Sequence, residues 1–184
     1  MTAAEFATSL GELAKRLNEV GPQAAETKAI IGTSLVVENI QKNGIGSYST
    51  KRLPDWYFSD KEINAGGRAY LSQKEGEKDK SKQGVTWGEF RAAQGLQNSR
   101  VDYTYTGRTL GGLVIVESGA TGNTFYAATG GSDKEVDDKL TYGIARYGES
   151  AFQPTAAMNK ELDEAVLDIL EAFIKKITGA TTTY

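Results

Sequence analysis

Cysteine and histidine are both absent from this sequence of 184 residues. Without cysteine the chain can form no disulfide bond, no thiol nucleophile and no zinc–thiolate site. Without histidine it lacks the Ser-His-Asp triad, the usual general base near neutral pH and most transition-metal sites. These two absences disfavour an enzyme, and we expect neither a catalytic centre nor a bound metal or cofactor.

Long apolar runs and a strong charge of one sign are missing as well. A membrane-spanning helix needs roughly 20 consecutive apolar residues, and no such run occurs here. The amino terminus has no basic segment followed by an apolar block and a cleavage site, so we expect synthesis in the cytosol. The formal net charge of -3 argues against the broad basic face of general nucleic-acid-binding proteins. We therefore expect no membrane and no specific nucleic-acid binding among the interactions of this chain.

The composition favours one globular domain over residues 1–184, because its length and 39% apolar content suit a single hydrophobic core. The clearest element is an amphipathic helix over residues 155–178, with Thr155 as its N-cap. Its apolar stripe recurs at helical spacing and consists of Leu162, Val166, Ile169, Leu170, Phe173, Ile174 and Ile177. We expect Leu170 and Phe173, at the centre of the stripe, to be buried against a sheet.

Residues 3–43 are predicted to form two helices. The first carries a narrow apolar stripe at alternating steps of four and three, made up of Phe6, Leu10, Leu13, Leu17 and Val20. Such a stripe is typical either of packing within the domain or of a coiled-coil seam between subunits, and it covers only about two heptads. Gly21 and Pro22 interrupt the pattern, and Pro22 suits the first turn of a second helix. Phe6 and Leu13 are candidate partner-binding residues.

Residues 44–85 differ in character, because glycines interrupt a polar stretch that cannot build much core. We interpret them as a long loop without secondary structure. One part stands out, since Trp56, Tyr57 and Phe58 form an aromatic cluster inside polar sequence. Such a cluster is either a local staple onto the core or an anchor for a partner. Both readings stay open, and the three aromatic residues are candidate partner-binding residues.

A short helix or turn over residues 87–95 should follow the loop, with Trp87, Phe90 and Leu96 facing inward. In the sheet region, residues 100–130, apolar residues alternate with polar ones or form β-branched runs. This pattern predicts an antiparallel meander of three strands, over residues 101–105, 110–118 and 124–129, with a turn at residues 106–108 between the first two.

A further helix over residues 132–147 is predicted by the capping-box spacing of Ser132 and Glu135. The order of elements is then two helices, a long loop, a small sheet and two more helices. This order indicates an α+β domain in which helices cover one face of an antiparallel sheet.

None of the glycine or carboxylate motifs indicates chemistry by itself. The pair Gly130-Gly131 lies between a strand and a helix, but Asp133 and Glu135 at the start of that helix would repel an anion. The pairs Asp137-Asp138 and Asp163-Glu164 could in principle form a carboxylate couple for metal or glycoside chemistry. Acidic pairs on helices usually belong to a solvated face, and we interpret these pairs in that way.

Five short stretches share a resemblance to a known family. They are Thr86-Trp87-Gly88-Glu89-Phe90-Arg91, Gly95-Leu96-Gln97-Asn98-Ser99, Tyr105-Thr106-Gly107-Arg108-Thr109-Leu110, Tyr142-Gly143-Ile144-Ala145-Arg146-Tyr147-Gly148 and Phe152-Gln153-Pro154-Thr155. Together they resemble the neck proteins of tailed phages known as tail-completion or virion-morphogenesis proteins. In that family a tryptophan segment precedes a Thr-Gly-x-Leu/Met turn, which is one residue longer here. The resemblance covers roughly residues 87–177, and residues 48–84 match nothing in it.

The resemblance implies a non-enzymatic structural subunit that forms a homo-oligomeric ring at the junction of portal and tail. Its partners would be copies of itself and other neck, portal or tail proteins of the phage, and its location would be the virion neck after synthesis in the host cytoplasm. Two alternatives belong to other classes. One is a non-catalytic adaptor that binds one protein through Trp56 and Tyr57, and the other is a small carboxylate-dependent hydrolase.

Overall fold

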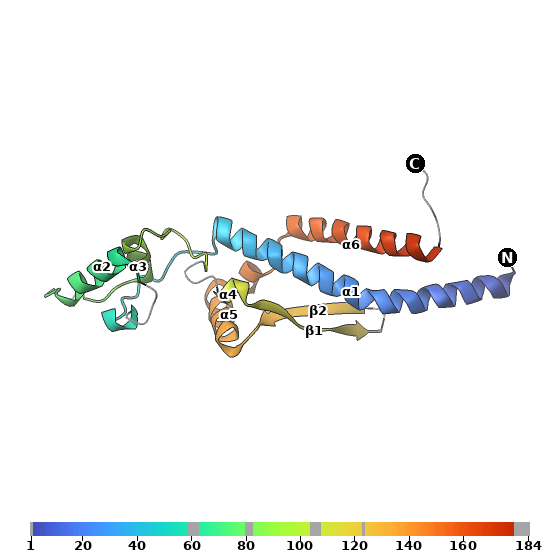
Figure 1. Ribbon diagram of the computed structural model, residues 1–184, viewed down its shortest axis with the longest axis horizontal. Coiled ribbons are helices and arrows are strands. Elements are labelled where there is room, and N and C mark those ends of the chain that lie inside the picture. Colours follow the sequence, from blue (N-terminus) through green and yellow to red (C-terminus); the bar gives the residue numbers. More distant parts are fainter. Residues whose placement is uncertain (1, 59–62, 80–82, 104–107, 123, 179–184) are drawn as a thin grey trace. The chain divides into compact units, whose positions relative to one another are not determined.

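Figure 1 shows the chain as a computed structural model, which describes residues 2–58, 63–79, 83–103, 108–122 and 124–178. The chain divides into two compact units. Unit 1 comprises Met1–Asn39 and Tyr103–Tyr184, and unit 2 comprises Ile40–Asp102. The described residues form mostly helices and one small antiparallel sheet, so the fold is α+β, as the sequence predicts.

The first element is one continuous helix, α1, over Ala3–Asn43. The prediction of two helices broken at Gly21 and Pro22 is wrong, because Pro22 lies inside α1. A proline within a helix costs about 3 kcal/mol, since it removes a hydrogen bond and crowds the preceding turn. Packing overrides that local signal: Gly21 is buried, and a Cβ atom there would collide with the ring of Phe125.

The sheet of unit 1 is a hairpin of β1, Leu113–Thr121, and β2, Thr124–Gly131. The two strands pair antiparallel from Leu113 opposite Gly131 to Thr121 opposite Thr124. The register shifts between Ile115 and Glu117, which indicates a β-bulge at this point of β1.

The prediction of a first strand over residues 101–105 is wrong where the structure describes it. Val101 and Asp102 are buried in unit 2, where the backbone of Val101 exchanges hydrogen bonds with Ile45 and Gly46. Residues 104–107, with the rest of that strand and most of the expected turn, lie outside the described residues. The short helix α4, Arg108–Gly111, leads into β1.

Two helices follow the hairpin, as predicted. Helix α5, Lys134–Tyr147, begins one residue later than the capping box indicates, because Asp133 is the N-cap and accepts a hydrogen bond from the Val136 amide at 3.0 Å. After the 3-10 turn η2, Glu149–Phe152, helix α6 covers Ala156–Thr178.

Helix α6 packs on α1 rather than on the sheet. Figure 1 shows α1 running between α6 and the hairpin. Leu162 is buried against Gly32, and Lys28 donates to Asp163 at 2.7 Å. The expectation that Leu170 and Phe173 are buried against the sheet is therefore wrong, and both side chains are only half-buried. The buried centre of the stripe lies at Leu162 because the glycine at position 32 lets the two helices approach closely there.

Unit 2 contains secondary structure that the sequence reading missed. Within the expected loop the structure has the 3-10 turn η1, Asp55–Phe58, and helix α2, Ala65–Glu75. Asn64 caps α2 by accepting a hydrogen bond from the Gly67 amide at 2.9 Å. A Cβ atom at Gly66 would meet the carbonyl oxygen of Ala93, so this helix packs through its glycines rather than through an apolar stripe.

The short helix expected over residues 87–95 is α3, Trp87–Ala93, and it carries the core of unit 2. Its capping box joins Thr86 and Glu89. Phe90 is fully buried, but Leu96 is exposed, so the expectation that Leu96 faces inward is wrong.

Candidate partner-binding surface

The aromatic cluster of unit 2 begins where two distant segments of the chain pair. Leu53 and Val85 exchange two backbone hydrogen bonds of 2.9 and 2.8 Å, and η1 follows directly after Pro54. This pairing fixes the start of η1 next to the start of α3, so the aromatic side chains of both elements meet.

Phe58 is the part of the cluster that belongs to the core. It is fully buried, with its ring centroid 5.2 Å from that of Trp87 and 4.5 Å from that of Phe90. Tyr57 makes edge contacts with Phe58 at 5.3 Å and with Trp87 at 6.4 Å. Edge-to-face contacts of this kind hold the rings in a defined geometry.

Trp56 and Tyr57 form the outward part of the same cluster. The exposed fraction is 69% for Trp56 and 40% for Tyr57. The two hypotheses for the cluster thus apply to different residues. Phe58 packs into the core, whereas the side chain of Trp56 is exposed to solvent and available to a partner. Exposed tryptophan and tyrosine on a firmly packed base are the side chains most often found at the centre of protein interfaces. We call Trp56 and Tyr57 the aromatic turn.

The other two candidate residues belong to α1 in unit 1. Leu13 is half-exposed, and Leu10 on the same stripe is exposed. The side chain of Phe6 lies outside the described side chains. The structure places Trp56, Tyr57 and Phe58 together, while Phe6 and Leu13 stand in the other unit.

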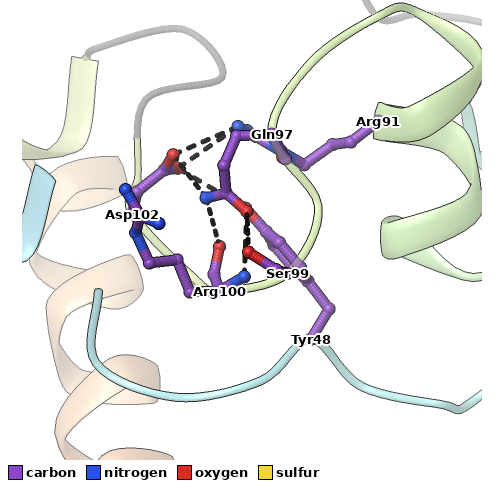
Figure 2. A network of polar contacts seen from close by, with 6 residues as sticks. All are labelled: Tyr48, Arg91, Gln97, Ser99, Arg100 and Asp102. Atoms are coloured by element: carbon purple, nitrogen blue, oxygen red, sulfur yellow. Dashed lines mark hydrogen bonds and ion pairs between the residues drawn. The ribbon is translucent and has the colours of Figure 1, made fainter. Parts of the chain in front are cut away.

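A buried polar network joins the first and last segments of unit 2 (Figure 2). The sequence did not predict this network. Arg91 and Asp102 form an ion pair at 3.3 Å, and their side chains are only 3% and 6% exposed. Gln97 donates through Nε2 to Asp102 at 2.9 Å and to the Arg100 carbonyl at 2.7 Å. Arg91 Nε donates to the Gln97 carbonyl at 2.6 Å. Both carboxylate oxygens of Asp102, and Nε and Nη2 of Arg91, therefore have partners, and such partners offset the cost of burying an ion pair.

Tyr48 joins this network from the segment that enters unit 2. Its hydroxyl donates to Asp102 at 3.4 Å, and the Arg91 guanidinium lies 5.4 Å from its ring centroid. Burial raises the pKa of Tyr48 to about 12, with a smaller upward contribution from Asp102 and an opposing one from Arg91. The hydroxyl consequently keeps its proton and stays a donor at any physiological pH.

No sequence signal pointed to this network. Its members Tyr48, Arg91 and Asp102 come from three separate segments, and each residue type is ordinary on a protein surface. Two backbone hydrogen bonds close the same place, from Ile45 to the Val101 carbonyl at 3.0 Å and from Val101 to the Gly46 carbonyl at 2.7 Å. The first and last segments of unit 2 thus lie side by side, and the network and these backbone hydrogen bonds connect them.

The carboxylates considered for chemistry make structural contacts in unit 1. Asp137 accepts a hydrogen bond from the Gly131 amide at 2.7 Å and so ties the end of β2 to α5. Asp138 pairs with Lys134 at 2.8 Å, and Asp163 pairs with Lys28. Across the part of the chain that the structure describes, no three His, Cys, Asp or Glu side chains gather in a way that could hold a metal ion.

Among the described residues, no helix combines the length and apolar character needed to cross a membrane. No protein-family model, curated protein or solved structure matches the chain.

Proposed function

We propose that the chain is a non-catalytic structural subunit of a tailed-phage neck. In this proposal it assembles as a homo-oligomeric ring at the portal–tail junction and contacts other neck, portal or tail proteins. The proposal starts from the short sequence stretches that resemble tail-completion proteins. Its structural support is the amount of apolar surface that unit 1 leaves uncovered.

The exposed apolar surface of unit 1 is most evident on the hairpin. Val114, Val116 and Tyr126 are exposed, with 56% of Val116 accessible to solvent. A two-stranded sheet is marginally stable by itself. Phe125 packs on α1, whereas Val114, Val116 and Tyr126 stay exposed among the described residues. Apolar side chains grouped on an exposed sheet face are typical of surfaces that bind another chain.

A ring fits this surface better than a single two-fold dimer does. In a ring, each subunit offers one surface to its first neighbour and a different surface to its second neighbour. Exposed apolar side chains occur in both units: Val116 and Leu167 belong to unit 1, and Trp56 belongs to unit 2. A subunit that contacts several neighbours needs more than one exposed apolar surface of this kind.

The adaptor remains the second candidate because of one specific observation, the exposed aromatic turn in unit 2. An adaptor would use Trp56 and Tyr57 for one partner and would leave unit 1 as a passive support. The hydrolase alternative gains no support from Asp137 or Asp163, because each of them is engaged in a contact that joins two elements of unit 1.

The solution mass of the purified full chain tests the proposal, measured by native mass spectrometry together with negative-stain electron microscopy. We expect a closed oligomer with one defined copy number and a ring-shaped projection. A chain that remains a monomer at every concentration, and that binds one soluble protein in a one-to-one complex, would support the adaptor instead.

A further inference from the structure

The two units differ in the sign of their charge. Residues 40–102 contain 11 Lys and Arg against 8 Asp and Glu, so unit 2 carries a net charge of +3. The whole chain has a net charge of -3, which leaves -6 for unit 1. A positive unit and a negative unit on the same chain attract each other between copies, and such complementarity selects partners and orientation.

Helix α6 presents an apolar pair on its outer face. Leu167 is 58% exposed, and Ile174 lies seven residues further along the same side of the helix and is also exposed. Leu162, which is buried against α1, points to the opposite side. The pair is therefore not part of the packing that holds α6 on α1.

Acidic residues border this apolar pair. Glu164, Asp168 and Glu171 are exposed, and helical spacing places them beside Leu167 and Ile174. We call these five residues the outer face of α6. Lys175 pairs with Glu171 at 3.7 Å, so Glu164 and Asp168 carry the remaining negative charge of this face. An apolar centre with charged residues around it has the layout of a protein–protein contact, and the remaining negative charge favours a basic partner.

The aromatic turn of unit 2 has the matching layout. Trp56 and Tyr57 are the apolar centre, and Phe58 holds them in place from below. Next to the turn, Arg52 and Lys74 line a cleft together with Pro54 and Asp55. The cleft also includes Glu75, and Arg52 pairs with Glu89, so the attraction comes from the net charge of unit 2 rather than from one free cation.

We propose that the aromatic turn of one copy docks on the outer face of α6 of a neighbouring copy. This inference rests on the proposed function, since it supplies the contact between neighbours in the ring. The occupant is a second copy because one chain carries both halves, an aromatic centre on the positive unit and an acid-bordered apolar face on the negative unit. The two surfaces are different, so the contact is head-to-tail and can close into a ring.

The absence of cysteine allows a direct test by disulfide crosslinking. Full-length Asp55→Cys and Lys175→Cys variants, which place the thiols beside the two apolar centres and leave those centres intact, are prepared separately, mixed and oxidised mildly. We expect a disulfide-linked dimer to form at least about tenfold faster in the mixture than in either variant alone, because docking raises the effective concentration of the two thiols. The matched control pair is Leu96→Cys with Ile30→Cys, which are exposed in unit 2 and unit 1 but lie outside both surfaces.

A second measurement follows the strength of the contact. Trp56→Ala and Leu167→Ala should each weaken oligomer formation by about tenfold or more, whereas Leu96→Ala should leave it unchanged. Raising the salt concentration should weaken the contact further, because the attraction between the units is electrostatic.

The outcomes separate this inference from the proposed function. If rings form normally, give no selective disulfide and tolerate Trp56→Ala, the docking proposal is wrong. The proposed function as a ring subunit would be unaffected by that result. An Asp55→Cys, Lys175→Cys double variant that forms its disulfide within a monomer would also overturn it. A chain that forms no oligomer would overturn the docking and the proposed function together.

Discussion

Gly21 of α1 faces the ring of Phe125 in β2, and a Cβ atom at position 21 would overlap that ring. This contact joins the longest helix to the sheet and lets α1 continue through Pro22. Gly21, which the sequence suggested as part of a helix break, is thus a point of close contact between α1 and β2.

Substitution at this glycine should be costly. Gly21→Ala should destabilise the protein by about 1–3 kcal/mol, because the added methyl group must push Phe125 out of its place. The control is Gly11→Ala in the same helix, where nothing lies within 4 Å of the added atom. That variant should gain roughly 0.5–1 kcal/mol from helix propensity. Urea unfolding of both variants checks the sign of each effect, and equal effects would refute the contact.

The aromatic cluster should separate into two roles. Phe58→Ala should cost about 3–5 kcal/mol of folding stability, because it empties the core of unit 2. Trp56→Ala should change stability by less than about 1 kcal/mol and should act on association instead. Thermal unfolding and solution mass, measured on both variants, test this division. A large fall in melting temperature for Trp56→Ala with intact assembly would place the contact surface elsewhere, first on the stripe of α1.

The buried ion pair should matter far more than the exposed ones. Asp102→Ala leaves the Arg91 guanidinium buried without its carboxylate, which should cost about 3–5 kcal/mol. The control, Asp138→Ala, removes a pair whose side chains are 86% and 67% exposed, and it should change the stability very little, because solvent screens an exposed ion pair. Amide hydrogen exchange at Phe90 and Val101 reports on unit 2 directly. Similar exchange rates in both variants would contradict the structural role of the network.

High pH should weaken the same network. The pKa of Tyr48 is about 12 in the folded protein against 10.0 for an ordinary tyrosine, so folding favours its protonated form. Its contribution to stability is complete below pH 10 and is lost as the pH rises through 12. Tyr48→Phe has no proton to lose and should show a smaller fall in stability over that interval. Chemical denaturation at several pH values compares the two proteins, and parallel curves would contradict the raised pKa.

The helices α5 and α6 could be predicted from the sequence alone. The stripe of α6 and the capping residues of α5 predicted both helices, because these signals are local and act within a few residues. The β-branched run Val114, Ile115 and Val116, and the aromatic pair Phe125 and Tyr126 after a turn, likewise predicted the two strands β1 and β2. Whether the two units unfold as one domain, as the composition favours, stays a prediction.

The predictions that failed did so because contacts between residues far apart in the sequence determine those parts of the fold. The break at Pro22 was wrong because Phe125, about a hundred residues away, packs on Gly21. The strand at Val101 was wrong because its backbone pairs with Ile45 and Gly46. Helix α2 was missed because it packs through glycines and has no apolar stripe. In the candidate surface, only the division between Phe58 and Trp56 needed coordinates, since the cluster itself was visible in the sequence.

The most direct test of the central claim, the proposed phage-neck function, is electron microscopy of the virus particles produced together with this chain when the chain carries a visible label. We expect the label at the neck, between portal and tail, in a ring of fixed stoichiometry. Virions that carry the label elsewhere, or that lack it altogether, would contradict the assignment of this chain as a neck subunit.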